Sequence, residues 1–138
     1  KARLKKASLE AANKMNEIKD EKTAQYQSPA IGGVWRNDYN EQYAKRQRKG
    51  INTVNLRSNK PGLRSIEDVT IKNIGNGAVI TFNQKSRKVG KKSVNMAKVL
   101  NAHQIGKATG LKRRQIFPDN VAQLPREVLE VAKAELLR

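Results

Sequence analysis

The strongest periodicity in the chain lies in residues 1–25, where apolar side chains recur at spacings of three and four. This spacing predicts a helix whose apolar face is formed by Leu4, Ala7, Ala11, Met15 and Ile18. The apolar stripe is narrow and rich in alanine. We therefore expect the helix to pack closely against another element.

Residues 69–74 and 77–83 show the alternation and the β-branched composition that are typical of strands. In the first segment, Val69 and Ile71 share one face and the even-numbered residues share the other. The sequence Gly-Asn-Gly at 75–77 joins the two segments, and both residue types tolerate positive φ. Together these features predict a tight β-hairpin.

The segments between the N-terminal helix and this hairpin are less regular. Proline and paired glycines indicate a loop at 26–34, and residues 36–49 are predicted to form a second helix. A polar connector is expected at 51–62, followed by one helical turn at 63–67.

Three segments follow the hairpin towards the C-terminus. Residues 94–105 fit a helix, but from Val99 onward they also fit a strand, so both structures remain open. Residues 111–118 favour a short extended piece. Residues 120–138 carry the best helical pattern, with Pro125 in the first turn.

These elements predict an α+β fold formed by a single domain, residues 1–138. A small antiparallel β-sheet with a central hairpin is flanked by an N-terminal helix and a C-terminal helix. The apolar content is 37% and the aromatic content only 4%, so we expect a thin core that neighbouring molecules help to order.

The charge of the chain is unusually positive and unevenly distributed. The formal net charge is +17, and residues 51–118 carry 14 basic and 2 acidic side chains. Between Lys85 and Arg114 there are ten Lys or Arg and no Asp or Glu. A solvated protein face normally mixes both signs, so this excess indicates an anionic partner, either a phosphate backbone or an acidic protein surface.

The densest part of this excess is predicted to be a polybasic loop at 84–93. The candidate contact residues in and after this loop are Lys85, Arg87, Lys88, Lys91, Lys92, Lys107, Lys112, Arg113 and Arg114. No aromatic residues are interleaved with them. Contact with nucleic acid would therefore be electrostatic and independent of base sequence, rather than based on stacking.

The sequence gives little support to catalysis, cofactor binding or metal binding. There is no cysteine, and the single histidine, His103, has no evident nucleophile or acid beside it. We expect it to be a structural, hydrogen-bonding residue. Glu67 and Asp68 are the only acidic pair in the middle of the chain, and no phosphate-binding glycine motif is present. We therefore expect a protein that is not an enzyme.

Two further features have structural interpretations. Trp35, Tyr39 and Tyr43 are expected to serve packing rather than ligand binding. No apolar run approaches the roughly 20 residues that a membrane span needs, and no signal peptide is visible, so no membrane partner is predicted.

Three short motifs occur in a fixed order along the chain. The first comprises YAKRQRKG at 43–50 and LRSNKPGLRSIED at 56–68, which contains Leu63, Arg64, Ser65 and Ile66. The second is AHQIG at 102–106, which contains His103, Gln104 and Gly106. The third is KRRQIFP at 112–118, which contains Phe117.

In their order and spacing these motifs resemble those of the virion morphogenesis and tail-completion proteins of tailed bacteriophages. The family has a Leu-Arg-x-Ser-Ile element, a His-Gln-Phe-Gly element, and an Arg-Pro-Phe-Leu tract before the last helix. Here Ile105 and Gln115 replace the second motif's aromatic residue and the third motif's proline.

The resemblance implies a structural virion protein that completes the tail and joins it to the head at the neck. The expected partners are further copies of the chain in a six-fold ring, and the tail tube, tail terminator or head-connector proteins. Packaged DNA in the channel is a further expected partner. The expected location is the virion, with assembly in the host cytoplasm.

A second function remains open from the composition alone. A basic protein that binds nucleic acid through phosphate contacts, either ribosome-associated or DNA-binding, would show the same excess of Lys and Arg and the same scarcity of aromatics.

Overall fold

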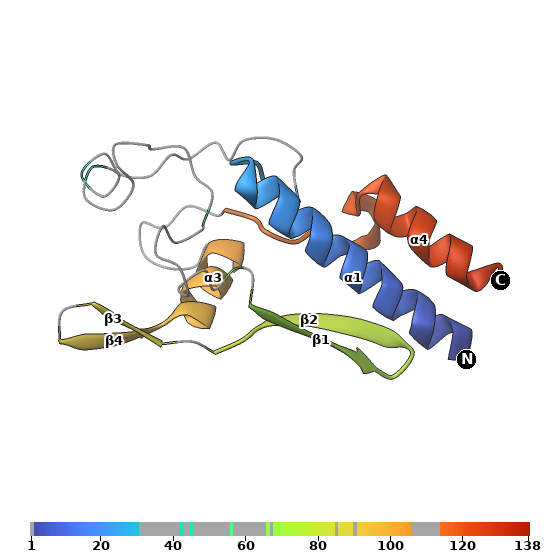
Figure 1. Ribbon diagram of the computed structural model, residues 1–138, viewed down its shortest axis with the longest axis horizontal. Helices are drawn as coiled ribbons and strands as arrows, with labels where there is room; N and C mark the ends of the chain where they lie inside the picture. The colour runs from blue at the N-terminus through green and yellow to red at the C-terminus, as the bar shows by residue number, and fades with distance from the viewer. Residues whose placement is uncertain are drawn as a thin grey trace.

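The computed structural model describes residues 2–30, 42, 45, 56, 66, 68–84, 86–89, 91–105 and 114–138. Figure 1 shows, in chain order, α1 (Ala2–Ala24), β1 (Val69–Ile74), β2 (Gly77–Phe82), β3 (Ser86–Val89), β4 (Lys92–Asn95), α3 (Met96–Ile105), a 3-10 turn (Val121–Gln123) and α4 (Arg126–Leu136). The predicted α+β class, with a hairpin flanked by N- and C-terminal helices, is confirmed.

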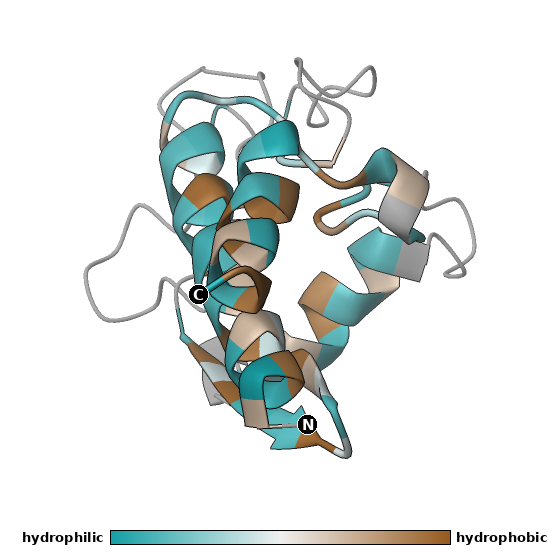
Figure 2. Ribbon diagram, turned by 90° about the vertical axis from the view of Figure 1, so that its right-hand side faces the viewer, coloured by the Kyte–Doolittle hydropathy of each residue, from teal (hydrophilic) through white to brown (hydrophobic). Residues whose placement is uncertain are grey.

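The predicted N-terminal helix is confirmed as α1, and its apolar face packs against α4. Met15 and Ile18 are buried together with Val128 of α4. Lys6, near the start of α1, forms an ion pair with Glu135, near the end of α4, at 3.3 Å, so the two helices run antiparallel. Leu4 was expected on this buried face but is 43% exposed. Figure 2 shows the two helices side by side, viewed from the end where both termini lie.

The predicted hairpin is confirmed. β1 and β2 pair antiparallel, with Val69 opposite Phe82 and Ile74 opposite Gly77. Gly75 has φ +59°, which suits the first position of a two-residue type II′ turn. The face that carries Ile71 and Ile80 lies towards α1, because Ile80 packs on the buried cluster that α1 forms with α4.

The polybasic loop predicted at 84–93 is wrong, since most of this segment forms a second hairpin. β3 and β4 pair antiparallel, with Ser86 opposite Asn95 and Val89 opposite Lys92. A two-stranded ribbon has no covering layer and needs no continuous apolar face, so lysine-rich strands can form it. The Gly-Lys pair at 90–91 also has the composition of a two-residue hairpin turn.

The residues at the N-terminal ends of the two helices after this ribbon determine where each helix starts. The open question over 94–105 is resolved as α3, because the Asn95 Oδ1 atom accepts hydrogen bonds from the backbone N–H groups of Ala97 and Lys98. The helix expected from 120 begins only at Arg126. Pro125 has ψ 145° at the N-cap, and a proline disfavours helical backbone in the residue before it.

The core consists of two buried clusters that share one aromatic side chain. The first contains Leu56, Ile66, Leu100 and Ile116, and the second contains Met15, Ile18 and Val128. Phe117 packs against both. Its ring also lies 5.6 Å from that of Phe82 of β2. The segment 114–118, which has no regular secondary structure, therefore connects the two halves of the core.

Several expectations lie wholly or partly outside the described residues. Within the second helix expected at 36–49, Gln42 and Lys45 are helical, and Ile66 lies in a 3-10 turn within 63–67. The connector at 51–62, apart from Leu56, and the aromatic residues Trp35, Tyr39 and Tyr43 lie outside the described part. Among the described helices, none has the length and apolarity required to span a membrane.

Candidate functional site

The side chain of Gln104 makes three hydrogen bonds to the segment 114–118. Its Oε1 atom accepts from the backbone N–H of Ile116 at 2.6 Å and of Phe117 at 2.8 Å. Its Nε2 atom donates to the carbonyl of Phe117 at 2.8 Å. We call these three bonds the Gln104 clasp. A side-chain amide here satisfies backbone groups that neither a helix nor a sheet would pair.

Bonds from other parts of the chain hold the same segment on either side of the clasp. The Arg114 N–H donates to the His103 carbonyl at 2.8 Å. The hydroxyl of Ser28, which is fully buried, donates to the Gln115 carbonyl at 2.9 Å. The segment is therefore fixed both by α3 and by the chain that follows α1.

The clasp brings together parts of the three sequence motifs. Ile116 of the third motif is fully buried in the first cluster together with Ile66 of the first motif and Leu100 of α3. The Nζ atom of Lys19 donates to the Ile66 carbonyl, which ties α1 to the same cluster. Leu63, Arg64, Ser65 and Gly106 lie outside the described residues. Described residues of all three motifs, among them Ile66, Gln104 and Ile116, thus belong to one structural unit.

His103 does not have the hydrogen-bonding role that was expected of its side chain. Its Nδ1 atom is buried and has no hydrogen-bond partner in the described part of the chain. Burial, followed by the nearby charge of Arg114, lowers the pKa of His103 from 6.5 to about 4. The ring is therefore neutral at pH 7, and the hydrogen bonding is done by the adjacent Gln104.

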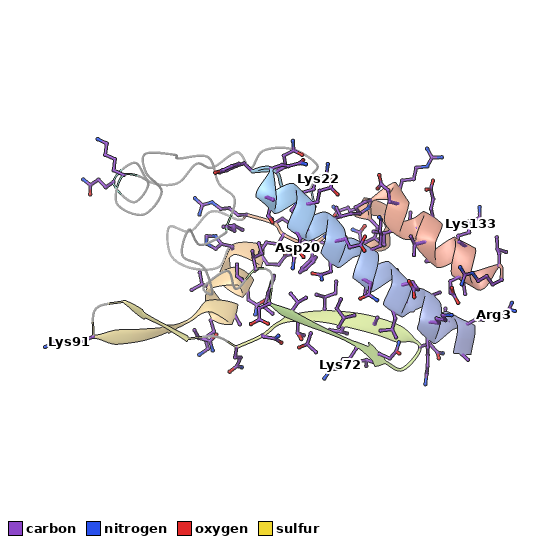
Figure 3. All side chains as sticks on the ribbon, in the orientation of Figure 1. Arg3, Asp20, Lys22, Lys72, Lys91 and Lys133 are labelled. Carbon is purple, nitrogen blue, oxygen red and sulfur yellow. The ribbon has the colours of Figure 1, made fainter. Side chains whose placement is uncertain are left out.

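The candidate contact residues are divided between two places. Arg87, Lys88 and Lys92 belong to strands β3 and β4, and Lys91 is exposed at the turn between these strands. Arg114 is only partly exposed and lies beside His103. Lys85, Lys107, Lys112 and Arg113 lie outside the described residues. Figure 3 shows Lys91 at the tip of the ribbon, directed away from the rest of the molecule.

Two buried polar residues of the site were not identified from the sequence. Lys19 is fully buried, and its Nζ atom also lies 3.0 Å from the Asp20 carboxylate. It lies four residues after Met15, on the apolar face of α1. This spacing was the signal in the sequence that its side chain is buried. Ser28 had no such signal, because its partner is 87 residues away.

The contacts that define this arrangement are hydrogen bonds and apolar packing. No group of three or more His, Asp or Glu side chains suitable for a metal ion occurs among the described residues. No protein-family model, curated protein or solved structure matches the chain.

Replacing Gln104 tests the clasp. We expect Gln104→Glu to lower the free energy of unfolding by about 2–3 kcal/mol at pH 7, because a carboxylate cannot donate to the Phe117 carbonyl and repels it. The loss should shrink towards pH 5 as the carboxyl gains a proton that it can donate. Urea denaturation at both pH values measures this effect.

Gln84→Glu is the matched control for this substitution. Gln84 is exposed and makes no hydrogen bond among the described residues, so the change should cost less than about 0.5 kcal/mol. Equal losses for the two variants at pH 7 would contradict the clasp.

The lowered pKa of His103 predicts a stability that depends on pH. Between about pH 6.5 and pH 4 the unfolded chain binds a proton at this residue and the folded chain does not. The free energy of unfolding should therefore fall as pH is lowered through this window, by at most about 1.4 kcal/mol per pH unit from this group. Above pH 6.5 the ring is neutral in both states, so this group no longer makes the free energy of unfolding depend on pH.

An NMR titration of the only imidazole in the chain tests this directly, and urea denaturation at pH 7 and pH 5 tests the linkage. His103→Asn should lose this part of the pH dependence. A titration midpoint near 6.5 in the folded chain would show that the expected environment of His103 is wrong.

Proposed function

We propose that this chain is a structural protein of a tailed-bacteriophage virion, which completes the tail and joins it to the head as an oligomeric ring at the neck. The observation that supports this most is the Gln104 clasp. Ile66 of the first motif and Ile116 of the third are buried in one core cluster, and Gln104 of the second is hydrogen-bonded to the third. The resemblance thus concerns a single folding unit rather than scattered matches.

A ring subunit needs exposed apolar surface for its neighbours, and one end of the molecule offers it. Ser8 of α1 donates to the carbonyl of Asn76 in the β1–β2 turn, so this turn, the start of α1 and the end of α4 share one end. Figure 1 shows both termini there. We call it the terminal end. Its exposed apolar side chains are Leu4 (43% exposed), Ile74 (59%), Leu136 (44%) and Leu137 (76%).

This surface is suited to contacts between protein subunits. Exposed apolar side chains that gather on one region of a protein commonly mark an interaction site. Glu135, which directly precedes Leu136 in the chain, pairs with both Lys6 and Arg138, at 3.3 Å in each case. These pairs neutralise part of the positive charge that would otherwise oppose the approach of a second copy.

The ring hypothesis predicts association that depends on the terminal end. Light scattering after gel filtration, with negative-stain electron microscopy, should reveal rings as concentration rises. We expect Leu136→Asp to raise the dissociation constant at least about tenfold, because burial of a leucine stabilises by about 1.5–3 kcal/mol. Leu129→Asp is the matched control, since Leu129 lies on the same helix and is 43% exposed.

The decisive specimen is the particle itself. Tails assembled without the protein should fail to join filled heads, and addition of the purified chain should restore joining. A chain that stays monomeric at all concentrations and does not associate with tails would overturn the proposal.

The β3–β4 ribbon favours a second candidate function, electrostatic binding of nucleic acid. It carries four Lys or Arg and no carboxylate, and it projects away from the helices (Figure 1). A two-stranded ribbon of this kind can enter the major groove of DNA.

Salt dependence tests this second function. If four phosphates are contacted, affinity for duplex DNA should fall roughly 100-fold between about 50 and 200 mM salt. Replacing Arg87, Lys88, Lys91 and Lys92 by alanine should flatten the slope, whereas Lys72→Ala and Lys133→Ala should not. Weak binding with a shallow slope to both DNA and RNA would eliminate this function and leave the ring hypothesis untouched.

A further inference from the structure

A groove lies between strand β2 and helix α3, on the side of β2 that β1 does not occupy. Its volume is about 430 Å³, within the range of roughly 300–1,000 Å³ that is usual for binding pockets. Its lining includes Ile80 and Phe82 of β2, and Gln84, which follows β2. It also includes Lys98 and Asn101 of α3, and Phe117.

The wall formed by β2 is an open strand edge. The Asn83 N–H donates to the Asp68 carbonyl, which makes residues 68 and 83 a hydrogen-bonded pair. Because such pairs alternate along an antiparallel ladder, Thr81 is bonded to Thr70, whereas the backbone groups of Ile80 and Phe82 point away from β1. These outward groups have no hydrogen-bond partner within the described part of the chain. An unpaired edge of this kind accepts another strand.

Two exposed side-chain amides line the groove: Asn101 on α3 and Gln84 just after β2, and neither is hydrogen-bonded among the described residues. An amide both donates and accepts, as a peptide group does. Asn101, on the α3 side, can therefore pair with the far edge of an inserted strand, whose backbone would otherwise lack partners.

The floor of the groove can take an apolar side chain. The rings of Phe82 and Phe117, with centroids 5.6 Å apart, and Ala97 of α3 all contribute to the lining. A strand added to an edge directs alternate side chains to opposite faces, so every second residue would contact these apolar groups.

We propose that this groove binds an extended, acidic segment of a partner protein as a strand added to β2. Charge complementarity selects this occupant. The lining contains Lys98 and no carboxylate, and the N-terminus of α3, with its positive dipole end, lies at the same groove. Residues 85–114 carry no Asp or Glu at all. A second copy, with a net charge of +17, is a poorer match than an acidic strand.

This site goes beyond the proposed function and does not depend on it. If a ring forms but binds no acidic strand, only the site is refuted. If the chain binds the strand but stays monomeric at all concentrations, only the ring is refuted. The two outcomes are therefore distinguishable.

The probe is a capped nine-residue peptide in which Glu alternates with Val or Thr, labelled for fluorescence polarisation. The control peptide carries Lys in place of each Glu. We expect saturable binding of the acidic peptide and at least about tenfold weaker binding of the basic peptide. In hydrogen-exchange NMR, the acidic peptide should protect the amides of Ile80 and Phe82 but leave that of Thr81, already bonded to β1, nearly unchanged.

A pair of charge reversals locates the site. Lys98→Glu should weaken binding of the acidic peptide by about three- to tenfold. Lys133→Glu, at a lysine that is also exposed but lies on α4 outside the groove, should leave binding unaltered. Circular dichroism verifies that both variants are folded.

Three results would overturn the proposal: no saturable binding at peptide concentrations up to about 1 mM, equal affinity for both peptides, or binding that leaves the Ile80 and Phe82 amides unprotected. Protection of these amides by rising protein concentration alone, without peptide, would instead assign the edge to a second copy.

Discussion

The fold depends on the way one side-chain amide replaces secondary structure in the middle of the core. The segment 114–118 has neither helical nor sheet pairing, yet Ile116 within it is fully buried. Buried backbone groups without partners would each cost roughly 1–3 kcal/mol. The Gln104 clasp supplies these partners for Ile116 and Phe117. Once the segment is fixed, Phe117 can pack against both hydrophobic clusters and so contributes to joining α1 and α4 to the cluster that contains Leu100 of α3.

This arrangement leaves little spare stability in the sheets. Each of the two sheets described is only two-stranded, and isolated two-stranded hairpins are marginally stable in water. The β1–β2 hairpin is supported because α1 covers one of its faces, and Asn73 of β1 also donates to the Lys5 carbonyl of α1. The β3–β4 ribbon has α3 as its continuation in the chain but no comparable cover among the described elements. Open strand edges and exposed apolar side chains therefore persist on the surface, and these are the features through which other chains can add order.

The sequence predicted the parts of this fold that local interactions decide. A spacing of three and four residues identified α1, and Gly-Asn-Gly identified the β1–β2 hairpin, because both depend on neighbours in the chain. The β3–β4 ribbon was missed since its lysines gave no apolar alternation, and the start of α4 was placed too early because Pro125 was assigned to the first turn rather than to the N-cap. Of the site, Gln104 and Phe117 were named through the family resemblance, but their contact was not predicted. A bond that joins residues 12 or 13 positions apart, across an irregular segment, leaves no periodic signal.

The distribution of charge separates two kinds of contact. At the terminal end, Glu135 pairs with Lys6 and Arg138, and the last 20 residues carry 3 basic and 4 acidic side chains. The ribbon lies at the opposite end of the molecule in Figure 1, in a stretch without any carboxylate. Identical copies repel one another least where their charges are already paired, and there the exposed leucines also supply an apolar contact. The terminal end is therefore the surface that best suits the self-association proposed above. Such contacts would leave the ribbon and the β2 edge free, and the absence of carboxylates from 85–114 favours the anionic partners proposed above for that side of the molecule.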